Sequence, residues 1–284
     1  MEIAKLSKLI TPSGTMAISN KARVLREQGK PVIGFGAGEP DFPTPEYVIK
    51  DVQVAAEDTS NHKYSPVAGL TILKEEIVRT SELYSGINVN QENVLVSNGG
   101  KHAILTTFMS ILNPGDEVLI PSPYWTTYPE AVKISGGNPV IVDTEFGDDF
   151  KINTDQLDAL KTSRTKVLVW VSPSNPTGVV YTKEEAEKIY TWAFENNVWI
   201  LSDELYEHLV YEGKTSPSPA QYDTGLKNTI VINGVAKAYS MTGWRVGWII
   251  ANTEVIDMAK KIQSHATSNV SNISQIAAYS ALKN

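Results

Sequence analysis

Short apolar runs rich in β-branched residues alternate along this chain with helix-length segments, and that alternation restricts the fold more than any other feature. Strands are expected at residues 93–100, 116–123, 139–144, 165–173, 198–204, 229–235 and 244–251. Helices are expected at a short N-terminal segment and at 101–112, 127–135 and 182–197. Helix-length segments between short strands are typical of a mostly parallel mixed sheet with helices on both faces, so an α/β fold is predicted.

The helix expected at 182–197 carries a start signal in its sequence. Thr182 stands just before the amphipathic segment and Glu185 follows three residues later, which is the pattern of a capping box. The segment 34–45 is rich in glycine and proline and is expected to be a turn or loop.

Composition and charge narrow the class of protein. Lys plus Arg number 25 against 32 Asp plus Glu, a formal net charge of -7, so nucleic acid is not an expected partner. The chain has no cysteine, which excludes disulfides and thiolate nucleophiles and is typical of a reducing compartment. We see neither a signal peptide nor an apolar run of about 18 residues, so no membrane partner and a cytoplasmic location are expected.

Polar residues follow several of the expected strands at the point where each strand ends. The runs NGGK, SPYW and SNPTG follow three strands, and Asp203 and Lys237 follow two others. In open α/β sheets ligands bind beyond the carboxyl ends of the strands, so these groups are expected to converge. A lysine amine at such an edge suits a Schiff base with an aldehyde, and pyridoxal phosphate is the aldehyde cofactor held in this way.

The same edge offers partners for the polar atoms of that cofactor. Asp203 can pair with the pyridinium nitrogen, and Tyr206 and Asn175 can donate hydrogen bonds to the phenolic oxygen. Arg245 can bind the phosphate in a bidentate manner.

Two further groups complete the expected cofactor site. Gly99, Gly100 and Lys101 open a helix directly after a strand, so their backbone amides can face the phosphate. Trp125 or Tyr124 can stack on the cofactor ring.

These residues lie in runs that together resemble a known family. The runs are YSPVAGL, NGGK, SPYWTTYPE, SNPTG, SDELYEHLVY and NGVAKAYSMTGWRVG. In this order and spacing, over nearly the whole chain, they resemble the class I aminotransferases of pyridoxal-phosphate fold type I, above all the bacterial aspartate aminotransferase subgroup. The resemblance implies transamination between an amino acid, here L-aspartate, and a 2-oxo acid, here 2-oxoglutarate.

The resemblance also implies roles for individual residues. Lys237 matches the lysine that binds the cofactor and then shuttles the proton, while Asp203, Tyr206, Asn175, Arg245 and Trp125 match the cofactor ligands described above. Tyr64 matches a residue that reaches the phosphate of a neighbouring subunit, which implies a homodimer.

The substrate ligands follow from the same resemblance. Gly38 matches a backbone contact to the substrate carboxylate, and Lys101 matches the residue used for the distal carboxylate of aspartate. Trp125 and Asn175 are expected to contact the substrate as well.

The sequence departs from the family pattern in two places. Gly234 and Ala236 stand where some relatives carry serines that bind the phosphate. Family members are also longer, so the expected organisation is an N-terminal arm with part of a small domain at 1–45 and a large cofactor domain at 46–284. The C-terminal small domain, with the arginine that pairs with the substrate α-carboxylate, is then absent. The arginines of the chain are Arg23, Arg26, Arg79, Arg164 and Arg245.

Several alternatives stay open at this point. The substrate could be prephenate, an aromatic amino acid or alanine, the reaction could be that of a pyridoxal-phosphate lyase, and the chain could be a cofactor-binding module with little turnover. Glu204 and His208 have the i, i+4 spacing of helical metal ligands, but no third ligand is evident and a partly buried structural histidine is favoured. No metal is therefore expected.

Overall fold

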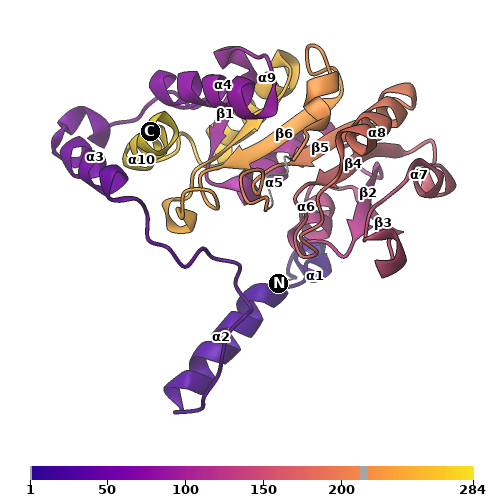
Figure 1. The fold of residues 1–284 in the computed structure, drawn as a ribbon, viewed down its shortest axis with the longest axis horizontal. Coiled ribbons are helices and arrows are strands. Elements are labelled where there is room, and N and C mark those ends of the chain that lie inside the picture. Colours follow the sequence, from indigo (N-terminus) through magenta and orange to yellow (C-terminus); the bar gives the residue numbers. More distant parts are fainter. Residues whose placement is uncertain (1, 212–215) are drawn as a thin grey trace.

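The computed structural model describes residues 2–211 and 216–284, and these residues are organised around a mixed sheet (Figure 1). The strands of the described residues are β1 (Val94–Ser97), β2 (Glu117–Ser122), β3 (Asn138–Asp143), β4 (Thr165–Val171), β5 (Trp199–Asp203), β6 (Thr229–Gly234) and β7 (Gly247–Ile250). Their order across the sheet is β1-β7-β6-β5-β4-β2-β3. β7 runs antiparallel to β1 and β6, and every other neighbouring pair is parallel. The predicted α/β fold with a mostly parallel mixed sheet is confirmed.

Helices flank the sheet on both faces. The α-helices of the described residues are α1 (Lys5–Leu9), α2 (Gly14–Glu27), α3 (Glu46–Glu57), α4 (Thr71–Ser85), α5 (Gly100–Ile111), α6 (Thr127–Ile134), α7 (Thr154–Leu160), α8 (Lys183–Glu195), α9 (Thr253–Ala266) and α10 (Asn272–Lys283). Short 3-10 helices lie at η1 (Thr59–His62), η2 (Gln91–Asn93), η3 (Phe146–Asp148), η4 (Pro219–Tyr222) and η5 (Thr242–Trp244).

The strands bury side chains on both faces because residues alternate between the faces along each strand. In β4, Val167 and Val169 pack with α5, α6 and α9, while Leu168 and Trp170 pack with α7 and α8 on the opposite face. Helices α4 and α10 cover the other half of that opposite face, against β1, β6 and β7. Burial on both faces explains why the strand sequences consist of nearly continuous apolar residues.

The prediction of the last strand, at 244–251, is wrong at its first residues. The strand begins at Gly247, and η5 and Arg245 precede it. Arg245 has a φ of 56°, a left-handed conformation that cannot continue an extended strand. The expected strand at 93–100 likewise ends at Ser97, because Gly99 takes a φ of 79° and caps α5. These two interruptions are where the backbone turns toward the edge that carries the polar residues.

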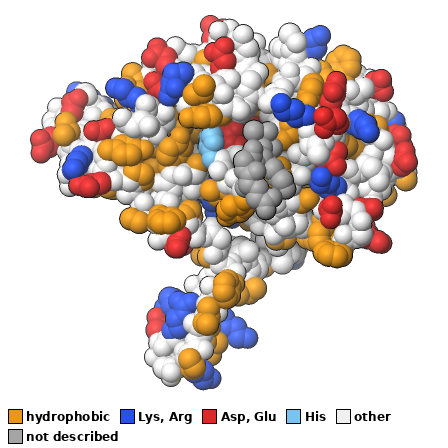
Figure 2. Space-filling model, viewed as in Figure 1, with side chains coloured by type: hydrophobic (Ala, Val, Ile, Leu, Met, Phe, Trp, Pro, Cys, Tyr) orange, Lys and Arg blue, Asp and Glu red, His pale blue; other side chains and the backbone are white. Residues whose placement is uncertain are grey.

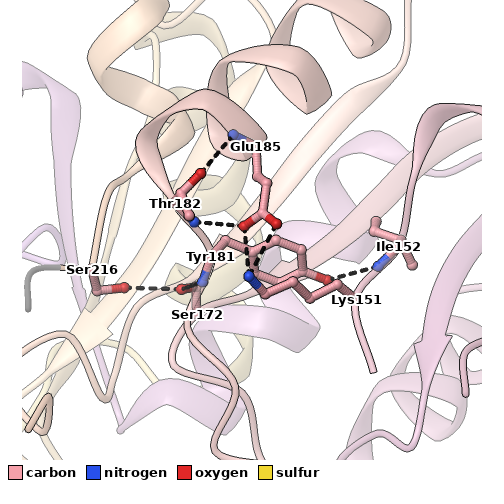
Figure 3. Close-up of polar contacts among 7 residues, drawn as sticks. All are labelled: Lys151, Ile152, Ser172, Tyr181, Thr182, Glu185 and Ser216. Atoms are coloured by element: carbon pink, nitrogen blue, oxygen red, sulfur yellow. Dashed lines mark hydrogen bonds and ion pairs between the residues drawn. The ribbon is translucent and has the colours of Figure 1, made fainter. Parts of the chain in front are cut away.

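The predicted capping box of α8 is confirmed (Figure 3). The Thr182 hydroxyl accepts the Glu185 N–H at 3.2 Å, and the Glu185 carboxylate accepts the Thr182 N–H at 2.6 Å. The same carboxylate binds Lys151 at 2.8 Å, and the Lys151 ammonium lies 5.5 Å from the centre of the Tyr181 ring. The start of α8 is thereby joined to the segment that follows η3.

The N-terminal helices form an arm with little contact to the body. Instead of one short helix the arm holds α1 and α2, neither of which has a buried residue. In Figure 1 α2 projects away from the sheet, and Figure 2 shows hydrophobic side chains along the same arm. The backbone N–H of Thr11 donates to Glu130 at 2.9 Å and ties the arm to α6. In the described part of the chain, no helix is both long and apolar enough to span a membrane.

Candidate active site

Asp203 is a buried carboxylate at the carboxyl end of β5. It is 4% exposed, and its Oδ2 accepts the hydroxyl of Tyr128 in α6 at 2.6 Å. Its Oδ1 accepts the Leu205 N–H at 3.3 Å. Burial raises the pKa of Asp203, and the Tyr128 hydrogen bond and the nearby charge of Lys237 oppose that rise. The pKa of Tyr128 is raised well above its ordinary value by burial and by Asp203, so Tyr128 keeps its proton and acts as the donor.

Lys237 lies in the loop that leaves β6, the parallel neighbour of β5. Its Nζ donates to the carbonyl oxygen of Gly38 at 2.5 Å and lies 5.5 Å from the centre of the Tyr206 ring. Tyr206 comes from the turn that follows Asp203. The structure therefore brings Gly38, Lys237 and Tyr206 together, although about 200 positions separate the first two.

The surroundings of Lys237 depress the proton affinity of its amine. Burial lowers the pKa of Lys237 and the charge of Arg245 lowers it further, while Glu39 and Asp203 raise it. A half-buried amine with a lowered pKa is neutral in a larger fraction of molecules than a surface lysine, and the neutral form is the nucleophile.

The start of α5 packs against Arg245 at the position expected for an anion site. Gly99 and Gly100 are buried, and a Cβ added at Gly99 would lie 2.6 Å from a guanidinium nitrogen of Arg245. A Cβ at Gly247 would lie 2.7 Å from the backbone nitrogen of Gly100, so glycine is required there for the strand to approach the helix. The Arg245 side chain donates to the Thr242 carbonyl at 2.8 Å and remains exposed.

Asn175 lies in a closed loop between β4 and α8. The Tyr181 N–H donates to the Ser172 hydroxyl at 3.3 Å, and the Ser172 and Ser216 hydroxyls are 3.0 Å apart (Figure 3). The Tyr181 hydroxyl accepts the Ile152 N–H at 3.1 Å. A small cavity at the ends of β2 and β4 is lined by Asn175 together with residues that include Tyr124 and Tyr128.

Trp125 and Lys101 lie beside each other at the same edge. Trp125 is half-buried and packs edge-on against Tyr128, with ring centres 5.6 Å apart. The Lys101 side chain is exposed, and its Nζ lies 5.3 Å from the centre of the Trp125 ring. A cation beside an aromatic face can receive a carboxylate from solvent, because an ammonium group has three donors.

Known proteins share both this sequence and this fold. The family described as aminotransferase class I and II matches residues 30–284. An aspartate aminotransferase of Streptomyces avermitilis is 50% identical over 96% of this chain and 67% of its own length. An aspartate/prephenate aminotransferase of Cereibacter sphaeroides is 44% identical over 96% of this chain and 68% of its own. The solved aspartate aminotransferase of Thermus thermophilus with maleate superposes with a TM-score of 0.96 at 39% identity, over 100% of this chain and 73% of its own.

The chain belongs to the class I and II aminotransferase family. It is an enzyme of the aspartate aminotransferase type, and the family uses pyridoxal phosphate. The predicted family and enzyme class are confirmed.

Tyr64 is the one predicted site residue of this aminotransferase that lies on an open surface away from the contacts described above. It is 92% exposed. It lines a polar hollow formed by residues 61–64, 267–269, 271 and 272, in which Asn272 donates to the Asn61 and Lys63 carbonyl oxygens at 3.2 and 2.8 Å. The role of Tyr64 toward a second subunit stays a prediction.

Glu204 and His208 do not share a helix. They lie at the two ends of a turn after β5, and Glu204 is buried and accepts the hydroxyls of Ser202 and Ser218 at 2.6 and 2.5 Å. The His208 side chain is 33% exposed and thus partly buried, and it packs edge-on against Tyr84 with ring centres 4.7 Å apart. Within residues 2–211 and 216–284, no three His, Asp or Glu side chains are grouped as a metal site requires.

Sequence reasoning missed two residues of the aminotransferase site. Tyr128 binds Asp203 directly, and the available signal was its place three residues after Trp125, at the start of the expected helix 127–135. Glu39 accepts the Thr242 hydroxyl at 2.9 Å and raises the pKa of Lys237, but a glutamate in a glycine-rich loop carries no signal of its own.

Proposed function

We propose that this chain transfers the amino group of L-aspartate to 2-oxoglutarate, with pyridoxal phosphate held at the carboxyl edge of the sheet. The observation that carries the proposal is the pairing of a half-buried amine with a buried carboxylate on the ends of neighbouring parallel strands. Lys237 follows β6, Asp203 ends β5, and the Tyr206 ring lies under the Lys237 ammonium.

The residues present fit pyridoxal phosphate. Asp203 is held as an acceptor by Tyr128 and is suited to a protonated ring nitrogen. Tyr206 and Asn175 are the donors for the phenolic oxygen. Gly99 lets the Arg245 guanidinium lie against the start of α5, because a Cβ there would be 2.6 Å from a guanidinium nitrogen, and this pairing of a cation with a helix N-terminus suits an anionic phosphate.

Trp125 and the backbone amides of Gly100 and Lys101 complete the set of cofactor ligands in this proposal. Trp125 presents an aromatic ring beside Tyr128, where it can stack on the cofactor. α5 begins at Gly100, so the first amides of the helix have no partner within it and are available to the phosphate.

The mechanism rests on the chemistry of Lys237 and its neighbours. When bound, pyridoxal phosphate supplies an electron sink for the bonds at the substrate α-carbon. Lys237 Nζ then holds and returns the α-proton as general base and acid, a role served by an amine whose pKa is lowered toward neutrality by burial. The Gly38 carbonyl holds this Nζ by accepting its hydrogen bond.

The substrate ligands in this proposal are Gly38, Asn175, Trp125 and Lys101. The exposed ammonium of Lys101 beside Trp125 is suited to the distal carboxylate of a dicarboxylic substrate. The names of the similar proteins from Streptomyces and Thermus support aspartate as the amino donor.

A substrate panel with two variants tests the proposal. We expect aspartate-dependent turnover with 2-oxoglutarate, and a visible absorbance band that borohydride bleaches as it fixes the cofactor covalently to Lys237. Lys237→Ala should abolish the visible band, the covalent fixation and turnover. Borohydride trapping of the cofactor on a different lysine in the unaltered protein would refute the assignment.

A second candidate is amination of prephenate or of aromatic oxo acids, supported by the name of the similar Cereibacter protein. The variant Lys101→Ala separates the two candidates. Loss of the preference for dicarboxylic over aromatic substrates supports aspartate, whereas an unchanged preference supports the second candidate.

The proposed organisation is an N-terminal arm at 1–45 and a cofactor domain at 46–284 that pairs with a second copy. The exposure of Tyr64 beside a polar hollow supports the pairing. A tyrosine that contributes to the active site of a neighbouring subunit has to be exposed on its own subunit. Sedimentation analysis tests the dimer. If Tyr64→Phe leaves the affinity for pyridoxal phosphate unchanged in a dimeric protein, Tyr64 does not reach the partner's phosphate.

A further inference from the structure

We propose that Glu207 is a positioning residue that fixes Tyr206 relative to Lys237 by joining the turn after β5 to β6 and to α4. This inference rests on the proposed function of Tyr206 and Lys237. Glu207 itself contacts neither the Lys237 amine nor the Tyr206 ring among the contacts of the described residues.

The first tie is a hydrogen bond that joins the turn to β6, the strand that precedes Lys237. Glu207 Oε1 accepts the side-chain N–H of Asn233 at 2.6 Å. Asn233 is buried and stands next to the last residue of β6, where its own Oδ1 accepts the Gly234 N–H at 2.7 Å. The amide side chain of Asn233 is therefore held on both sides, and Lys237 follows a few residues later.

The second tie joins the turn to the end of α4. Glu207 Oε2 accepts the hydroxyl of Ser85, the last residue of α4, at 2.7 Å. A carboxylate at a helix C-terminus is disfavoured by the helix dipole, so helix stability does not account for its place. The hydrogen bonds from Asn233 and Ser85 account for the place of the Glu207 carboxylate, because hydrogen bonds to an ionised acceptor are stronger than neutral ones.

The backbone leaves Tyr206 dependent on these ties. The Glu204 N–H continues the ladder to the Ile232 carbonyl at 2.9 Å, but the turn then departs from the sheet. Its backbone closes on itself through Glu207 N–H to Glu204 O at 3.0 Å and Leu209 N–H to Tyr206 O at 2.8 Å, and neither bond reaches β6 or α4. Tyr206 lies between these two glutamates. Holding Glu207 to Asn233 therefore fixes the position of Tyr206 relative to Lys237, whose Nζ lies 5.5 Å from the centre of the Tyr206 ring.

Two titratable side chains of the same turn lie near Glu207. His208 Nε2 lies 3.4 Å from Oε1, and the charge of Glu207 raises the pKa of the buried Glu204. Glutamine at position 207 keeps the acceptor for Asn233 and offers Ser85 a donor, so it preserves both ties without the charge. Alanine removes both ties, which makes Glu207→Gln and Glu207→Ala a matched pair.

Hydrogen exchange of the cofactor-free protein is the first test. We expect amide exchange of residues 204–211 and 233–238 to be at least about fivefold faster in Glu207→Ala than in the unaltered protein, because two ties are lost. Glu207→Gln should exchange as the unaltered protein does. Glu195→Ala, an exposed residue at the end of α8, is the control and should change nothing. Unchanged exchange in Glu207→Ala overturns the proposal, and Asn233→Ala serves in its place if Glu207→Ala does not fold.

Titration of the bound cofactor's visible absorbance is the second test. A donor to the phenolic oxygen favours its ionised form, so a displaced Tyr206 should raise the titration midpoint by roughly half a pH unit and weaken cofactor affinity several-fold. Glu207→Gln should restore both values. Faster exchange with an unchanged midpoint and affinity would make Glu207 structural only and overturn the proposal. Absence of any visible band in the unaltered protein would instead refute the proposed function.

Discussion

Glu204 offers a pH-dependent test of the buried structure behind the active site. It is 4% exposed and shares its oxygen with the hydroxyls of Ser202 and Ser218. Burial above all, together with the charges of Glu207 and Asp203, raises the pKa of Glu204 from 4.5 to about 8, although the hydrogen bonds from Ser202 and Ser218 lower it. Glu204 therefore carries a proton at neutral pH, and Glu204→Gln imitates that neutral form.

The size of the effect follows from the two pKa values. A group with a raised folded-state pKa contributes stability that is fully present below its unfolded-state value and is lost as the pH rises through its folded-state value. For Glu204 this stability is lost as the pH rises from 4.5 to about 8. At roughly 1.4 kcal/mol per pH unit, the free energy of unfolding should fall by about 3 kcal/mol between about pH 5.5 and pH 8.5 through this group alone.

Urea unfolding of the two proteins, followed by tryptophan fluorescence, measures the difference. We expect Glu204→Gln to gain about 3 kcal/mol relative to the unaltered protein between about pH 5.5 and pH 8.5. The remaining titrating groups are common to both proteins and cancel in the difference. A difference that stays constant over this range would refute the reasoning, since it would mean that Glu204 is already ionised at the lower pH.

Three further substitutions test the site and its supports. Tyr128→Phe removes the hydroxyl that binds Asp203, so the pKa of Asp203 should rise and equilibrium dialysis should give an affinity for pyridoxal phosphate lower by about tenfold. Gly99→Ala places a methyl group 2.6 Å from Arg245 at a φ of 79°, and it should lower both the urea midpoint and the affinity for inorganic phosphate. Thr182→Ala removes the N-cap of α8 and should cost about 1 kcal/mol in urea unfolding without changing cofactor affinity. Unchanged cofactor affinity in the first variant, unchanged phosphate affinity in the second or unchanged stability in the third would contradict the corresponding argument.

Local patterns in the sequence determined the strands, the helices α5, α6 and α8, and the edge at which polar residues gather. Each apolar run needed burial on both faces, which only a sheet between two helical layers provides. The ends of parallel strands share one edge, so Asp203 and Lys237 could be brought together from their positions after β5 and β6 alone. The start of α8 was predictable for a similar reason, since the capping box of Thr182 is made within four residues.

Contacts between distant segments were decided by the tertiary structure. Tyr128 reaches Asp203 because α6 packs against α5, β2 and β3. Glu207 reaches Asn233 and Ser85 because a turn, a strand and a helix end meet. A hydrogen bond between side chains far apart in sequence produces no periodicity or fixed spacing in the sequence from which it could be predicted. The start of β7 was also missed, because the left-handed backbone of Arg245 depends on the close packing of the neighbouring glycines rather than on its own preference.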